Sequence, residues 1–135
     1  MLYFAYGSNM DESQMAKRCP DVKLRNITQL NGYEFFIDAK GVASVREQRG
    51  KSVVGLRYEI SDADEAKLDR YEGVPTHYTK IQLQQIESFC YISTSPQGDD
   101  PRKDYLENIV SAAETHRFPN QYISELRSWY SKRQF

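Results

Sequence analysis

Runs of apolar residues, some continuous and some alternating with polar residues, predict most of the strands in this chain. Residues 2–6 are aromatic or aliphatic throughout, which is typical of a buried strand. Residues 52–60 form a second such run, in which Gly55 indicates a bulge or a close approach of another backbone. Two further strands are expected at residues 78–83 and 86–95.

The stretch between the first and the central strand predicts a hairpin. Residues 22–24 and 33–37 have strand-like composition and flank an Asn-Gly dipeptide at 31–32, which strongly favours a hairpin turn. Residues 46–51 are charged and are expected to be a loop. Because strands outnumber helices and short turns join most of them, antiparallel pairing should dominate. No repeat or linker divides residues 1–135, so we expect a single α+β domain.

Capping signals predict the first two helices. Asp11 and Gln14 have the spacing of a capping box, which indicates a helix starting directly after the first turn. A similar pattern begins at Ser61, and this second helix is expected to end near Tyr71. Gly73 follows that end and is suited to the left-handed conformation of a helix cap.

Apolar residues at helical spacing predict two more helices near the end of the chain. The third helix is expected to begin with Asp100 as its cap and Pro101 at its first position. The residues expected on the buried faces of these two helices are Leu106, Ile109, Val110 and Ala113, then Tyr122, Ile123, Leu126, Trp129 and Tyr130.

Composition excludes several classes of protein. The net charge is −1, from 18 basic and 19 acidic residues, which argues against partners such as nucleic acid or an anionic membrane surface. No apolar run approaches the roughly 18 residues that a membrane span needs. The two cysteines, Cys19 and Cys90, are too few and too isolated for a disulfide framework or a zinc cluster. A reduced, cytoplasmic setting is therefore expected.

The turn after the first strand is the first candidate site. Gly7, Ser8 and Asn9 are turn residues placed between a strand and a helix, and such a turn presents several backbone N–H groups to one point. Carboxylates and phosphates bind at sites of this kind. A strand–turn–helix junction without any ligand has the same local pattern, so the turn alone does not identify a function.

Two motifs together resemble the gamma-glutamylcyclotransferase-like, or AIG2-like, family. The first is Tyr-Gly-Ser-Asn at 6–9, and the second is Tyr-Glu-Gly-Val-Pro-Thr-His-Tyr at 71–78. The order of structural signals along the chain is similar as far as about Trp129. The resemblance implies a small mixed, mostly antiparallel β-barrel flanked by helices. It also implies that the two motifs meet at one mouth of that barrel.

The resemblance further implies a cyclotransferase that acts on a small-molecule γ-glutamyl amide. The α-amino group of the substrate would attack its own side-chain carbonyl, giving 5-oxoproline and a free amine. Glu72 then corresponds to the general acid/base, while Tyr6, Gly7, Ser8 and Asn9 would hold the substrate carboxylate. Neither a metal nor another cofactor is required, because the substrate supplies its own nucleophile.

Other interpretations of the same residues stay open. A glutamate at a helix end before glycine is usually a solvated surface residue. Tyr105 resembles a hydroxyl that faces the site in this family, but it would equally suit a helix face that packs on the core. We expect flanking residues, among them Tyr71 and Tyr78, to desolvate Glu72 and raise its pKa.

Three alternatives to a soluble γ-glutamyl substrate remain at this stage. The same fold could serve as a non-catalytic module that binds a carboxylate, or it could act on a carrier-linked γ-glutamyl group. A regulatory role would use Trp129 and Tyr130 as an exposed apolar face against a partner protein. The sequence does not predict the oligomeric state or the amine that leaves.

Overall fold

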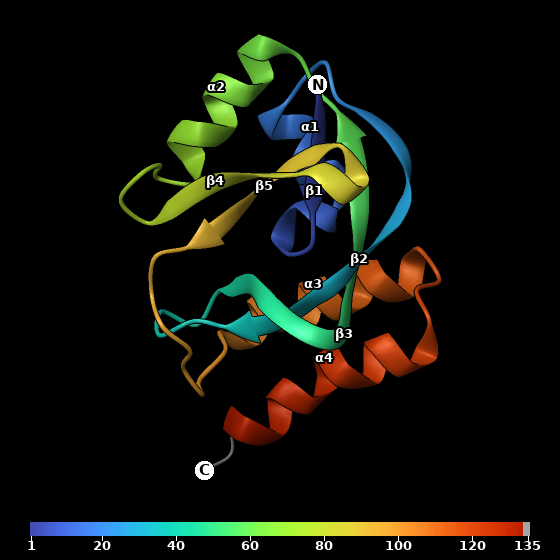
Figure 1. Cartoon of the computed structure of the whole chain (residues 1–135), viewed down its shortest axis with the longest axis vertical. Coiled ribbons are helices and arrows are strands. Elements are labelled where there is room, and N and C mark those ends of the chain that lie inside the picture. The colour runs from blue at the N-terminus through green and yellow to red at the C-terminus, as the bar shows by residue number, and fades with distance from the viewer. Residues whose placement is uncertain (134–135) are drawn as a thin grey trace.

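The computed structural model describes the backbone of residues 1–133 and the side-chain surroundings of residues 1–130. Its described strands all precede the last two helices along the chain, and two shorter helices lie between the strands (Figure 1). They are β1 (Leu2–Ala5), the 3-10 turn η1 (Ser8–Met10), α1 (Glu12–Arg18), β2 (Lys23–Ile37), β3 (Ala43–Glu59), α2 (Asp62–Tyr71), β4 (Tyr78–Leu83), the 3-10 turn η2 (Gln84–Ile86), β5 (Ser88–Ser93), α3 (Lys103–Thr115) and α4 (Asn120–Arg133).

Within residues 1–133, the strands form one sheet in the order β2-β3-β1-β5-β4, in which the β1–β5 pair is parallel and the other pairs are antiparallel. The expected mostly antiparallel α+β fold is therefore confirmed. The described part of the sheet is open rather than closed into a barrel, with β2 and β4 at its edges. The side chain of Gln85 in η2 covers part of the β2 edge: it donates to the Asn31 carbonyl at 2.9 Å and accepts from the Asn31 N–H at 3.1 Å.

The predicted hairpin at the Asn-Gly dipeptide is wrong. β2 continues through it, and Gly32 (φ +81°) lies at an irregularity where it faces residues 48–51 of β3. The expected charged loop at 46–51 is likewise part of β3. The hairpin turn lies at residues 38–42 instead, where Asp38 accepts hydrogen bonds from the backbone N–H groups of Lys40 and Val42. The left-handed glycine that the dipeptide provides serves a bulge, not a reversal of the chain.

Gly55 has the close backbone contact that the sequence predicts. A methyl group at this position would lie 2.4 Å from the carbonyl oxygen of Ala5 and 2.8 Å from the ring of Phe4. Any side chain here would push β1 away from β3. The strand that leads into the candidate turn is thus held tightly against the centre of the sheet.

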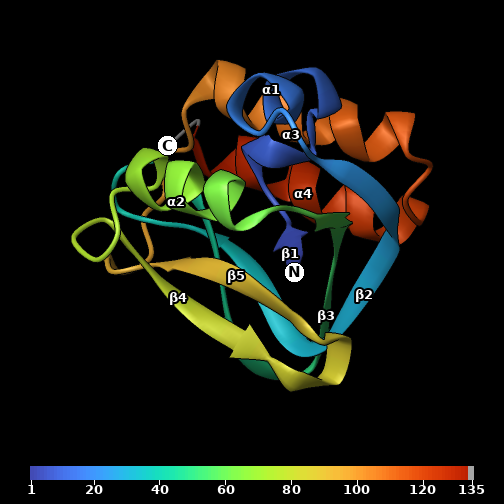
Figure 2. The same cartoon turned by 90° about the horizontal axis from the view of Figure 1, so that it is seen from above.

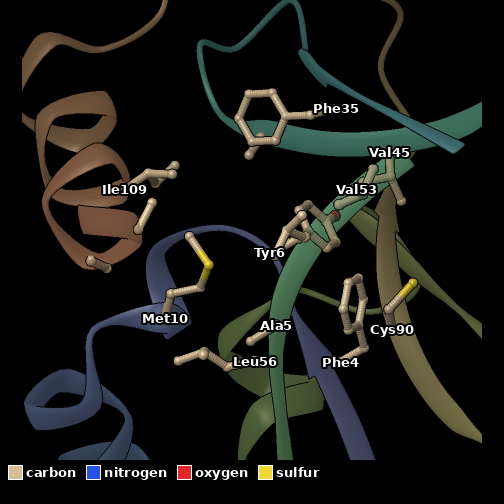
Figure 3. Close-up of a cluster of buried hydrophobic side chains, with 14 of the residues drawn as sticks. Phe4, Ala5, Tyr6, Met10, Phe35, Val45, Val53, Leu56, Cys90 and Ile109 are labelled. Atoms are coloured by element: carbon tan, nitrogen blue, oxygen red, sulfur yellow. The ribbon is translucent and has the colours of Figure 1, made fainter. Parts of the chain in front are cut away.

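Helices α1, α3 and α4 lie on one side of the molecule and the β4–β5 hairpin on the opposite side (Figure 2). The core between them is apolar and aromatic (Figure 3). Met10, which is 1% exposed, lies next to Leu56 of β3 and faces Ile109 of α3. The turn that follows β1 is therefore anchored to both the sheet and a helix.

The last two helices confirm the predicted buried faces, except that Tyr130 is only partly buried, and they correct one boundary. Leu106, Ile109, Val110 and Ala113 are buried, but Asp100 and Pro101 precede α3, whose cap residue is Arg102. Trp129 is 6% exposed and belongs to the core, so it does not form part of an exposed docking face. No helix among residues 1–133 has the length and apolarity that spanning a membrane requires.

Candidate active site

The turn after β1 is a single 3-10 turn that ends in a capped helix. The carbonyls of Gly7 and Ser8 accept from the N–H groups of Met10 and Asp11 at 3.0 and 3.2 Å. The Asp11 carboxylate caps α1, as predicted, by accepting from the backbone N–H groups of Ser13 and Gln14. Within residues 1–133, the N–H groups of Gly7, Ser8 and Asn9 have no hydrogen-bond partner. The turn thus keeps backbone donors available for an anion.

Glu72 lies at the C-terminal end of α2, where its backbone is fixed on both sides. Its N–H donates to the carbonyl of Leu68 at 2.8 Å, and Gly73 continues the chain in the left-handed conformation (φ +65°). A methyl group on Gly73 would lie 2.6 Å from the His77 ring. The glycine is therefore required both for its conformation and for the close packing beside it.

The structure brings these two distant segments into direct contact. The Asn9 side-chain amide donates to Glu72 Oε1 at 3.3 Å and to Tyr3 Oη at 2.9 Å. The other side of the same amide accepts a hydrogen bond from Arg18, and the Asn9 carbonyl accepts one from Tyr58 at 2.8 Å. Asn9 is 3% exposed, so this buried amide fixes the distance between the turn and the Glu72 carboxyl.

Burial raises the pKa of the Glu72 carboxyl above its ordinary value. The positive charge of Arg18 and the hydrogen bond from Asn9 act in the opposite direction and lower that pKa in part. The guanidinium carbon of Arg18 lies 3.5 Å from the centroid of the Tyr71 ring, and Tyr71 is 62% exposed. Of the residues expected to flank Glu72, Tyr78 lines the pocket that contains it, whereas Tyr71 does not.

Tyr105 of α3 lines the same pocket as Glu72. Its hydroxyl accepts a hydrogen bond from the Ala43 N–H at 3.0 Å. A methyl group on Gly7 would lie 3.3 Å from that hydroxyl oxygen and 3.4 Å from the Ala43 side chain. Of the two interpretations of Tyr105, the structure favours a hydroxyl that faces the site.

All six residues singled out from the sequence line one small pocket, which has about 300 Å³ of atom-free space including its open mouth. Tyr6 was expected to help hold the substrate carboxylate, but its hydroxyl already donates to the backbone carbonyl of Tyr91. Sequence reasoning also expected Tyr78 beside Glu72, but it missed Tyr3, Ala43 and Tyr91. The full lining is Tyr3, Tyr6, Gly7, Ser8, Asn9, Ala43, Glu72, Tyr78, Tyr91 and Tyr105.

The missed residues depend on pairing across the sheet. Tyr3 and Tyr91 come from the adjacent strands β1 and β5, where Tyr3 pairs with Phe89. Ala43 enters through the turn that Asp38 stabilises, and its carbonyl also accepts from the Tyr78 hydroxyl at 2.9 Å. The abundance of tyrosine, ten residues in all, was the only sequence signal for this wall.

Residues 1–133 contain no group of three His, Cys, Asp or Glu side chains arranged to hold a metal ion. His77 and His116 lie in different surroundings: His77 Nδ1 is 2.8 Å from Lys40 Nζ, and His116 Nε2 is 3.4 Å from a Glu12 oxygen. The chemistry available in the pocket is thus one partly buried carboxyl, several phenolic hydroxyls and the backbone donors of the turn.

Comparison with known proteins relates most of the chain to one family. The family described as "Gamma-glutamyl cyclotransferase, AIG2-like" matches residues 3–109. The gamma-glutamylcyclotransferase of Bos taurus is 24% identical over 94% of this chain and 77% of its own length. The human protein of the same name is 23% identical with the same coverage. A solved gamma-glutamyl cyclotransferase structure superposes with a TM-score of 0.86 at 23% identity, covering 94% of this chain and 86% of that one.

Proposed function

Because this chain belongs to the gamma-glutamyl cyclotransferase, AIG2-like family, we propose that it converts a small γ-glutamyl amide into 5-oxoproline and a free amine. The observation that carries the proposal is the 3.3 Å hydrogen bond from Asn9 to Glu72. This bond holds the turn at residues 7–9 next to the Glu72 carboxyl. The backbone N–H groups of that turn have no partner among the described residues, and burial raises the pKa of the carboxyl.

The turn is proposed to bind the α-carboxylate of the substrate. The free N–H groups of Gly7, Ser8 and Asn9 suit an anion. Holding the carboxylate orients the γ-glutamyl chain so that its α-nitrogen approaches its own γ-carbonyl. Orientation of this kind accounts for much of the rate of an intramolecular reaction.

Glu72 is proposed to move the proton in both halves of the reaction. Its carboxylate takes a proton from the α-ammonium group, and the freed nitrogen attacks the γ-carbonyl carbon to form the five-membered ring. The protonated carboxyl then gives the proton to the leaving nitrogen as the C–N bond breaks. The ring nitrogen loses its second proton to give the lactam N–H, and the freed amine takes up a proton to become an ammonium group. A pKa raised towards neutrality suits a group that must do both.

Tyr105 is proposed to stabilise the oxyanion that forms on the γ-carbonyl oxygen. Its hydroxyl oxygen already accepts from the Ala43 N–H, so its own proton is available to a ligand. It lies next to Gly7, where the absence of a side chain leaves room for the substrate. A donor fixed at this point would act only as charge develops.

The test is direct detection of 5-oxoproline released from a panel of γ-glutamyl amino acids, glutathione and γ-glutamyl-ε-lysine. We expect at least one compound to be converted, and the best of them identifies the leaving amine. In parallel, free glutamate should shift the amide resonances of Gly7, Ser8 and Asn9 in an NMR titration. No conversion of any compound, together with shifts confined to another region, would contradict the proposal.

A further inference from the structure

Tyr91 lines the pocket, and the proton of its hydroxyl is already used in a hydrogen bond within the protein. The residue lies on β5, is 3% exposed and lines the pocket together with Glu72. Its O–H donates to Asp69 Oδ1 at 2.7 Å. A tyrosine hydroxyl has one proton and two lone pairs, so Tyr91 can only accept a hydrogen bond from a ligand.

Asp69 is itself held in place from the outside of the molecule. It lies on α2 one turn before Glu72, and its Oδ2 accepts from Lys80 Nζ at 3.0 Å. Lys80 also donates to Glu65 Oε2 at 2.7 Å. One carboxylate oxygen therefore faces the pocket wall and the other faces a surface ammonium group, which fixes the direction of the Tyr91 proton.

The pocket consequently has two kinds of tyrosine hydroxyl, which differ in the hydrogen bond that they already make. Tyr3 and Tyr105 accept hydrogen bonds from Asn9 and Ala43, so their protons remain available to a ligand. Tyr78 and Tyr91 donate to the Ala43 carbonyl and to Asp69, so they offer lone pairs. Burial above all, followed by Asp69 and the other negative groups nearby, including Glu72, raises the pKa of Tyr91 and keeps its hydroxyl protonated.

We propose that the Tyr91 hydroxyl oxygen accepts a hydrogen bond from the α-ammonium group of the substrate next to Glu72, and that Asp69 is the positioning residue that makes this possible. The inference rests on the proposed function and deepens it, because it defines a subsite for the amino group. An ammonium group has three N–H donors and needs several acceptors once it leaves water. A hydroxyl locked as an acceptor favours ligands that carry the amino group over those that lack it.

Glutamate and glutarate are suitable probes because they differ only in the α-amino group. We expect the wild-type protein to bind glutamate more tightly than glutarate in isothermal titration calorimetry at pH 7. In Asp69→Asn, Lys80 should attract the amide oxygen, so that the amide NH2 faces Tyr91 and donates to its oxygen. The Tyr91 proton then points into the pocket, and glutamate affinity should fall about tenfold while glutarate affinity changes little.

A double variant separates this effect from simple damage. In Asp69→Asn with Lys80→Met, nothing holds the amide oxygen outward, so the amide can turn and accept from Tyr91 again. We expect most of the glutamate preference to return, a coupling that independent structural losses would not produce. Glu65→Gln is the matched control, since it changes a carboxylate on the same helix that contacts Lys80 but not Tyr91. Its glutamate preference should equal that of the wild type.

The outcomes distinguish the two proposals. If the wild-type protein releases 5-oxoproline and binds glutamate, but Asp69→Asn keeps the preference or weakens both probes equally, the ammonium subsite is wrong and the proposed function stands. If the double variant loses more preference than Asp69→Asn alone, the orientation argument is wrong. If the wild-type protein binds neither probe and converts no γ-glutamyl compound, the proposed function fails and this inference with it.

Discussion

The molecule has a small tyrosine-lined pocket at Glu72 and a larger hollow between α4 and the far ends of β2 and β3. The hollow has about 660 Å³ of atom-free space, against about 300 Å³ for the pocket, open mouths included in both. Two of the charged groups that line it pair with each other near the surface: Arg46 contacts Glu34 at 2.7 Å, and both side chains are partly exposed. The pocket instead joins a desolvated carboxyl to backbone donors without partners. Convergent polar groups, rather than size, indicate where the chemistry lies.

The largest expected effect compares one glutamate from each region. Glu72→Gln removes the proposed proton carrier but keeps an oxygen that can accept from Asn9. We expect 5-oxoproline release to fall by at least about 100-fold, because general acid–base catalysis typically contributes that much or more. Glu125→Gln, at an exposed position of the larger hollow, should leave the rate unchanged. Comparable activity in the two variants would remove Glu72 from the mechanism.

The second comparison uses two glycines. A methyl group on Gly7 would lie 3.3 Å from the Tyr105 hydroxyl oxygen, whereas one on Gly32 would meet no atom within 4 Å. Gly7→Ala should therefore lower kcat/KM by roughly tenfold with a small change in stability, because it narrows the site between the turn and Tyr105. Gly32→Ala should cost about 1 kcal/mol of stability, because φ is +81° there, and leave kcat/KM unchanged.

Thermal unfolding and steady-state kinetics on both glycine variants check this comparison. The opposite pattern, with activity lost in Gly32→Ala and kept in Gly7→Ala, would show that the active site does not include the turn.

The helix caps and the glycines show how far the sequence could predict the structure. Local signals were sufficient where a residue acts on the backbone of its own segment or through its own backbone conformation. The Asp11 and Ser61 caps, the left-handed Gly73 and the close contact at Gly55 are all as expected. The Asn-Gly dipeptide failed because a bulge and a hairpin turn require the same backbone angles, and pairing across the sheet decides between them.

The site was predictable only in part for a related reason. Residues 6–9 and Glu72 could be predicted because each lies within a continuous sequence motif. Tyr3, Tyr91 and Ala43 reach the pocket through strand register and through the Asp38 turn, and neither is visible in a local pattern. The hydroxyl orientations, which depend on partners such as Asp69, follow from three-dimensional contacts alone.

A smaller effect should appear in the pH dependence of the reaction. Glu72 acts as a base when ionised, so kcat/KM should fall as the pH drops through its pKa in the free enzyme. Arg18 lowers that pKa. Arg18→Gln, which can still donate to Asn9, removes the charge and should shift the acidic limb to higher pH. Arg18→Lys keeps the charge and should leave the limb near its wild-type position. An identical limb in both variants would mean that another group controls it.

The smallest expected effect is on folding stability. Because the pKa of Glu72 is higher in the folded protein than in the unfolded chain, ionisation opposes folding. Below the unfolded value of about 4.5 the carboxyl is protonated in both states and there is no penalty. As the pH rises through that value and then through the folded value, the buried charge destabilises the wild type. Glu72→Gln should therefore have the higher melting temperature at pH 8, with a difference that shrinks towards pH 4, whereas Glu125→Gln should follow the wild type throughout. A Glu72→Gln variant less stable than the wild type at pH 8 would mean that Arg18 and Asn9 outweigh desolvation, and that the carboxyl is held ionised rather than poised to exchange a proton.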